Sequence, residues 1–178
     1  MAINELLGAV APPTKPVKNG PPEAIPSIEA AIGLRLPREL FEFAEFYGTG
    51  KFGTTLTVYN PFSDRYRFEI GKICNLYRML KKNEGDEFIP YDIYPANPGL
   101  YPWAVDVNGH TLWWLTDGEA DKWPIVLMTV DASFERLDMS MSTFLAKAFR
   151  AEIDCVLWDR EWLRENFVGI LFEAETDS

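Results

Sequence analysis

The sequence predicts an α+β fold, with N-terminal helices, a central antiparallel or mixed sheet of about four to six strands, and C-terminal helices packed on that sheet. Three observations predict this class. Apolar residues recur at helical spacing through most of residues 26–83, alternating runs joined by turns occupy residues 103–130, and helical spacing returns after residue 140. Sequential hairpins give an antiparallel sheet, whereas a doubly wound parallel sheet would require strands and helices to alternate.

The N-terminal region combines a proline-rich stretch with two short helices. Residues 1–22 begin with apolar residues for one helical turn, which either docks or frays, and then contain five prolines that exclude a helix interior: Pro12, Pro13, Pro16, Pro21 and Pro22. Helices are predicted to begin at Pro26 and Pro37 and to end at Gly33 and Gly48. We therefore expect an extended arm followed by the first helices of the domain.

The glycines after the second helix raise the question of a phosphate-binding loop, because residues 47–55 read YGTGKFGTT. A Walker-type loop built on Lys51 would require glycine at position 45 and serine or threonine at position 52, where the chain has Glu45 and Phe52. A helix also precedes these glycines, which is the wrong order for binding an anion at a helix N-terminus. The stretch is therefore interpreted as a helix end and a turn.

The central elements follow from periodicity. Residues 52–61 alternate as one half-buried strand, and residues 69–83 predict a third helix with an apolar stripe. Asn108 and Gly109 lie between two alternating runs and predict a hairpin with a type I′ turn, which requires positive φ at both positions. A further strand is expected at residues 125–130.

The C-terminal elements are a fourth strand of this run near residues 133–138 and two helices. The first helix is expected from about residue 141, with Ser140 or Ser142 as its N-cap, and the second from Asp159. The domain organisation predicted is an arm over residues 1–22, a single α+β domain over residues 23–172, and an acidic, disordered tail over residues 173–178.

Charge and composition exclude several functions. The formal net charge of −10 opposes binding to nucleic acids and to anionic membranes. It leaves a basic protein partner open, although an acidic balance more often serves solubility alone. The two cysteines match no metal spacing, and the single histidine, His110, follows the hairpin turn as a surface residue. We expect no catalytic residue, no metal and no cofactor. The N-terminus lacks the positive charge of a signal peptide, so a cytoplasmic location is expected.

The segment from residue 103 to residue 123 gathers acidic and aromatic side chains. Two adjacent tryptophans, Trp113 and Trp114, face opposite sides of a strand, so one indole is exposed unless both faces of the sheet are covered. Exposed aromatic residues beside carboxylates form contact surfaces for basic partners. The alternative is that the tryptophans are core and the acids only form a turn. The candidate partner-binding residues are Asp106, Trp114, Asp117, Glu119 and Asp121.

Three stretches carry a family resemblance: IEAAIGLRLPRELFEFAEFYGTG, GLYPWAVDVNGHTLWWLTDG and STFLAKAF. Together they cover about residues 23–150, and their order and spacing resemble the SUKH superfamily, the domain of yeast Smi/Knr cell-wall regulators and of many bacterial immunity proteins. The resemblance implies an α+β fold without catalytic residues. It also implies a protein-binding function, because bacterial members resemble immunity proteins that neutralise a cognate toxin, often a nuclease.

Three functions are therefore compared. The first is an immunity protein of a bacterial toxin system, which binds a basic toxin through charge and aromatic contacts. The second is a regulatory or scaffold module for an endogenous partner. The third is a hydrolase that uses paired carboxylates such as Asp117 and Glu119, which is disfavoured because two acids in one short turn seldom face each other across a cleft. The sequence leaves the oligomeric state and the identity of the partner open.

Overall fold

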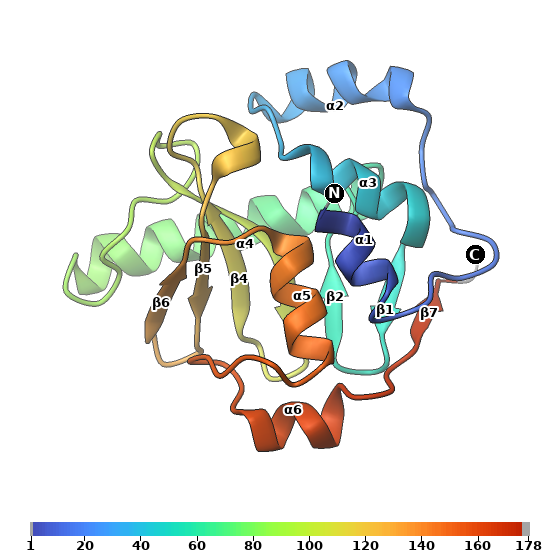
Figure 1. Ribbon diagram of the computed structural model, residues 1–178. Coiled ribbons are helices and arrows are strands. Elements are labelled where there is room, and N and C mark those ends of the chain that lie inside the picture. The colour runs from blue at the N-terminus through green and yellow to red at the C-terminus, as the bar shows by residue number, and fades with distance from the viewer. Residues whose placement is uncertain (1, 176–178) are drawn as a thin grey trace.

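The computed structural model describes residues 2–175 and confirms the α+β class (Figure 1). The α-helices are α1 (Ala2–Leu7), α2 (Ile25–Ile32), α3 (Arg38–Tyr47), α4 (Asp64–Glu84), α5 (Met141–Phe149) and α6 (Arg160–Asn166). Two 3₁₀ turns are η1 (Pro22–Ala24) and η2 (Ala120–Lys122). The strands are β1 (Gly50–Phe52), β2 (Leu56–Val58), β3 (Leu100–Asp106), β4 (Thr111–Leu115), β5 (Ile125–Met128), β6 (Phe134–Leu137) and β7 (Phe172–Ala174).

The sheet is antiparallel throughout, with strand order β6-β5-β4-β3-β2-β1-β7. Its seven strands slightly exceed the four to six predicted, for two reasons. Residues 50–58 form a hairpin, β1 and β2, rather than one strand, because Gly53 adopts a φ of 52° and reverses the chain. The last strand, β7, comes from the C-terminal segment and pairs with β1.

The turn between β3 and β4 differs from the predicted type I′ turn. Of its two central residues only Gly109 has positive φ, at 85°. The loop spans three residues, 107–109, and is closed by a backbone hydrogen bond of 3.0 Å from the Asp106 N–H to the His110 carbonyl. The Asp106 carboxylate accepts the backbone N–H groups of Asn108 and His110, each at 2.9 Å, which stabilises this longer loop.

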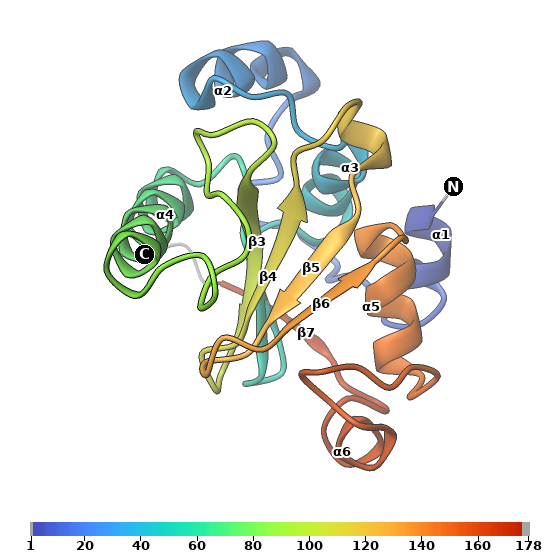
Figure 2. The same ribbon diagram turned by 90° about the vertical axis from the view of Figure 1, so that its left-hand side faces the viewer.

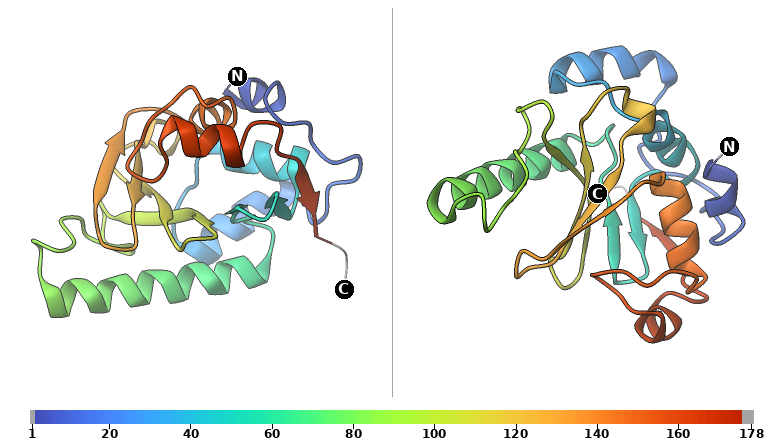
Figure 3. Two further views of the ribbon diagram at one scale, coloured as in Figure 1. Left: turned by 90° about the horizontal axis from the view of Figure 1, so that it is seen from below. Right: turned by 60° about the vertical axis from the view of Figure 1, so that its left-hand side comes forward.

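Helices cover both faces of the sheet. Figure 2 shows α4 on one side and α1 and α5 on the other, and Figure 3 shows α4 alone across its own face. On the α4 side, the Tyr77 ring meets the Trp113 ring edge-on at 5.2 Å between centroids. On the other side, Trp103 lies between Trp114 and Phe144 of α5, at 5.8 Å and 6.5 Å. Both adjacent tryptophans of β4 are therefore core residues.

The N-terminal segment packs onto the domain. Helix α1 docks rather than frays, with Ile3 and Leu6 buried against α5, and the Tyr47 hydroxyl donates to the Val10 carbonyl at 2.6 Å. The proline-rich stretch then runs beside the end of α3, where Thr49 N–H donates to the Val17 carbonyl at 2.7 Å. Gly48 permits this approach, because a Cβ there would lie 2.4 Å from the Val17 oxygen.

Several local predictions are confirmed. Ser140 and Asp159 cap α5 and α6 through their side chains, and the predicted apolar stripe of the third helix packs against the core. Helix α4 begins at Asp64, five residues before the predicted start. Residues 173–174 of the predicted tail belong to β7, and residues 176–178 lie outside the described part of the chain. The division at residues 22 and 172 stays a prediction. Within residues 2–175, the structure contains no helix with the length and apolar character needed to cross a bilayer.

Candidate protein-binding groove

The structure separates the five predicted contact residues into two groups. Asp106 and Trp114 lie inside the protein, with 5% and 0% of their surfaces exposed. Asp117, Glu119 and Asp121 are exposed on the acidic loop, residues 116–124, which joins β4 to β5 and contains η2. Only this second group is available to a partner.

Asp106 has a structural position. Besides the two turn amides, its Oδ2 accepts the indole N–H of Trp158 at 3.0 Å, and Trp158 is itself buried. The hydrogen bonds of this carboxylate therefore connect the segment before α6 to the β3–β4 turn. The expectation of an exposed Asp106 is corrected: its carboxylate accepts two partly buried turn amides and the buried indole N–H of Trp158, which lies 52 residues away and needs a buried acceptor.

The expectation of an exposed indole at Trp114 is corrected as well. The alternation of side chains along a strand indicates which residues share a face of the sheet, but it does not indicate whether other elements cover that face. Here α5 covers the Trp114 face and α4 covers the Trp113 face, so neither indole reaches the surface.

The acidic loop is held in a defined conformation. At its start, the Thr116 hydroxyl donates to the Gly99 carbonyl and accepts the Gly99 N–H, each at 2.9 Å. At its end, the Trp123 indole N–H donates to the Gly118 carbonyl at 3.2 Å. An ion pair of 2.8 Å joins Glu119 to Lys122, and the hydrogen bond from Lys122 to Glu119 raises the pKa of the lysine.

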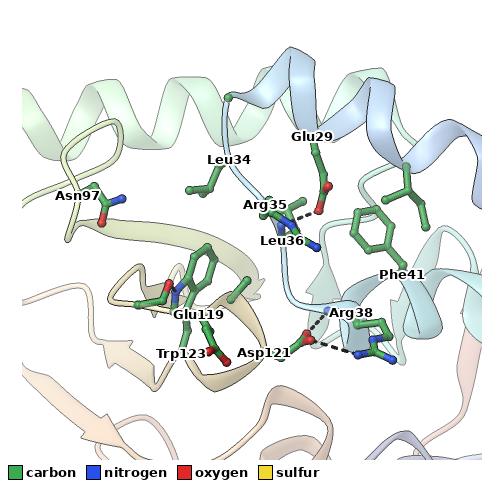
Figure 4. Close-up of a pocket in the computed structure, with 14 residues that line it drawn as sticks. Glu29, Leu34, Arg35, Leu36, Arg38, Phe41, Asn97, Glu119, Asp121 and Trp123 are labelled. Atoms are coloured by element: carbon green, nitrogen blue, oxygen red, sulfur yellow. Dashed lines mark hydrogen bonds and ion pairs between the residues drawn. The ribbon is translucent and has the colours of Figure 1, made fainter.

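A groove of about 690 Å³ lies between this loop and α2, and we call it the α2 groove (Figure 4). Its walls come from α2, the α2–α3 connection, the start of α3 and the acidic loop. The apolar residues that line it are Ile25, Leu34, Leu36, Phe41, Ala120 and Trp123. The charged residues that line it are Glu29, Arg35, Arg38, Glu119 and Asp121.

Two interactions fix the walls of the α2 groove. The Asp121 carboxylate accepts the backbone N–H of Arg38 at 2.6 Å and pairs with its guanidinium at 3.5 Å, which joins the acidic loop to the start of α3. Glu29 of α2 accepts the Leu36 N–H at 3.0 Å. Both contacts are drawn in Figure 4. They occupy Asp121 and Glu29. Of the other two carboxylates of the loop, Glu119 pairs with Lys122 at the exposed surface, and Asp117 forms no ion pair among residues 2–175.

The groove continues along α3. A second hollow of about 440 Å³ shares Ile25, Arg38 and Phe41 with the first and extends past Glu42 and Glu45. An elongated, mainly apolar surface with acidic residues at both ends results. This shape suits an extended or helical protein segment better than a small molecule, whose sites are enclosed.

Sequence reasoning missed most of the groove residues. Leu34 and Leu36 lie in GLRL, the link between the first two predicted helices, and Arg38 lies in the first turn of the second of these helices. A signal was present, because two leucines flank an arginine in a short connection. Their partner Asp121, however, lies 83 residues from Arg38, and no local pattern shows that contact.

Residues 2–175 contain no group of three or more His, Cys, Asp or Glu side chains arranged to hold a metal ion. His110 accepts the Val130 N–H at its Nδ1 atom, at 3.2 Å, beside the β3–β4 turn.

Residues 22–145 match the family model SUKH_6, described as SMI1-KNR4 cell-wall. The chain belongs to this SMI1-KNR4 family, whose domains are generally non-catalytic and are consistent with a protein-binding role, toxin immunity included. Comparisons with curated proteins and with solved structures gave no match.

Proposed function

We propose that the protein is a non-catalytic immunity protein, which binds a basic toxin through the acidic loop and the α2 groove. A nuclease is a toxin of the appropriate charge, because its active site must attract phosphates. The proposal includes a bacterial origin and a cytoplasmic location, where such a toxin would act. Asp117 and Glu119 are its primary contact residues, and Asp121 positions the loop through Arg38.

The observation that carries the proposal is the exposed, rigid acidic loop. Three carboxylates occur within five residues, and Lys122 is the one basic side chain of the loop. Thr116 and Trp123 hold the loop at both ends, so little conformational entropy is lost when a partner binds. Fixed negative charge on a protein of net charge −10 accelerates encounter with a basic partner.

The α2 groove supplies the apolar part of the contact. Stable interfaces combine an apolar centre with a polar rim, and here Leu34 and Trp123 lie beside Glu119 on the walls of one groove. An apolar side chain of the toxin would enter the groove while its neighbouring Lys or Arg residues meet Glu119 and Asp117.

Co-expression with the protein encoded by the neighbouring gene tests the proposal. The expected result is that the neighbour arrests growth alone and that this chain rescues growth and co-purifies with it. A harmless neighbour, or one that does not bind, removes the basis for the immunity function. Binding to an endogenous partner without rescue would instead support the regulatory module.

Charge-reversed variants locate the surface. The double variant Asp117→Lys, Glu119→Lys should weaken toxin binding at least tenfold and slow association. The matched control, Glu152→Lys with Glu165→Lys, changes the net charge equally at exposed sites near α5 and α6, at the other end of the molecule in Figure 1. Equal loss in both variants would mean that only overall charge matters and that the loop is not the binding surface.

A further inference from the structure

Helix α4 presents an exposed apolar stripe to solvent. Phe68, Leu76 and Met79 are 66%, 52% and 62% exposed, and at 100° per residue they fall on the side of the helix that faces away from the sheet. The inward side is formed by Tyr66, Ile70 and Cys74, which are buried. Large apolar side chains grouped on one helix face indicate a contact surface more strongly than scattered ones do.

Gly71 lies between Phe68 and Leu76 in sequence and is exposed at the flank of this side, next to a hollow that α4 shares with Ala31 and Ile32 of α2. A Cβ added there would meet no atom within 4 Å, so no packing within the described chain requires a glycine. Glycine in an exposed helix interior lowers helix stability relative to any residue except proline. A glycine between exposed apolar residues permits the backbone of a second helix to approach closely.

We propose that this face binds a second copy of the chain, with the two α4 helices antiparallel about a two-fold axis near the midpoint of residues 73 and 74. In this register Phe68 of one copy meets Met79 of the other, because the two positions are equally far from the midpoint. Thioether sulfur against an aromatic ring is a favourable contact. This antiparallel register therefore places the exposed apolar residues of one copy against those of the other.

Charge favours the same arrangement. Asp64 begins α4 and Lys82 lies in its last turn, nearly equidistant from the same midpoint, so each Asp64 approaches the Lys82 of the other copy. Lys82 forms no ion pair among residues 2–175, and the Asp64 side chain is 91% exposed with only Arg67 of its own helix as partner. Antiparallel helices also place the positive end of each helix dipole beside the negative end of the other. A parallel pair would bring like charges together.

The dimer is independent of the proposed function. Helix α4 covers the face of the sheet opposite α5 (Figure 2), whereas the residues that line the α2 groove include none from α4. Two copies joined through α4 therefore leave both grooves open. The contact between two helices is small, so we expect a weak dimer with a dissociation constant on the order of 100 µM.

Sedimentation equilibrium of the full chain between about 5 µM and 1 mM tests the self-association. Phe68→Glu should weaken it at least tenfold. The control Leu171→Glu, at a side chain that is 70% exposed beside β7, should change it less than twofold. Gly71→Gln should weaken the dimer while raising monomer stability, which separates a lost contact from a folding defect. A monomer at every concentration, or equal effects of Phe68→Glu and Leu171→Glu, would overturn the proposal.

Cross-linking tests the orientation. In a background that carries Cys155→Ser, an oxidised mixture of Phe68→Cys and Met79→Cys chains should form disulfide-linked heterodimers. Each variant alone should form few, because identical positions are about 16 Å apart along antiparallel helices. Efficient cross-linking of Phe68→Cys with itself would contradict the antiparallel arrangement.

Discussion

Replacing Asp106 by asparagine tests whether this carboxylate has the structural function that its contacts define. Asparagine keeps one oxygen for the turn amides but directs an NH₂ group, a donor, toward the indole N–H of Trp158. The buried indole then loses its acceptor, which costs about 1–3 kcal/mol of unfolding free energy. Asp106→Ala also releases the turn amides. Because these lie near solvent, we expect each to add only about 0.5–1.5 kcal/mol.

Urea unfolding followed by circular dichroism measures these losses as a shift of the midpoint at constant slope. The control is Asp117→Asn, the same substitution on the exposed acidic loop, which should change the stability by less than about 0.5 kcal/mol. In a double-mutant cycle, Trp158→Phe and Asp106→Asn should be non-additive by about 1 kcal/mol or more. Equal effects of the two asparagine variants, or strict additivity in the cycle, would show that the bond from Trp158 to Asp106 does not stabilise the fold.

Three further predictions concern the backbone, a buried acid and the thiols. Gly48→Ala should lower the unfolding free energy by about 2–4 kcal/mol, because the new Cβ would overlap the N-terminal segment. The control is Gly85→Ala, because Gly85 also has positive φ but has open space around it. This variant should lower the unfolding free energy by about 1 kcal/mol in the same urea titration. Burial raises the pKa of Glu39 above its ordinary 4.5, so the native state favours the protonated carboxyl. The unfolding free energy of the natural protein, relative to that of Glu39→Gln, should therefore fall as the pH rises from 4.5. A difference in unfolding free energy that stays constant with pH would contradict this. Burial raises the pKa of Cys74 to about 12 and that of Cys155 to about 11. Alkylation of these thiols at about pH 8, followed by mass spectrometry, should therefore be on the order of 100-fold slower in the native than in the unfolded protein. Rapid labelling of either thiol in the native protein would refute the raised pKa.

Local patterns predicted much of the fold because the physics that determines those elements is local. The caps at Ser140 and Asp159 depend on the next few residues only, and the apolar stripe of α4 depends on helical spacing. The turn at Gly109 was placed correctly but assigned the wrong type. Its loop length depends on hydrogen bonds to the Asp106 side chain, which a two-residue Asn-Gly signal does not contain.

The candidate site was less predictable because its features depend on contacts distant in sequence. Whether Trp114 is exposed depends on α5, which follows β4 by more than 25 residues. The α2 groove exists because Asp121 holds the start of α3 through Arg38. Sequence reasoning identified the acidic residues of the loop but not the apolar wall opposite them, which determines what kind of segment can bind.

The position of β7 has a consequence for synthesis on the ribosome. Strands β1 to β6 pair with their neighbours in chain order, so this part of the sheet can assemble as the chain emerges. Among residues 2–175, the strand that pairs with the outer edge of β1 is β7, whose residues follow about 120 positions later. At a translation rate of ~5–20 residues per second, that edge stays open for roughly 6–24 s. Lys51, exposed at the centre of β1, is the kind of charged residue that discourages another chain from pairing there during this interval.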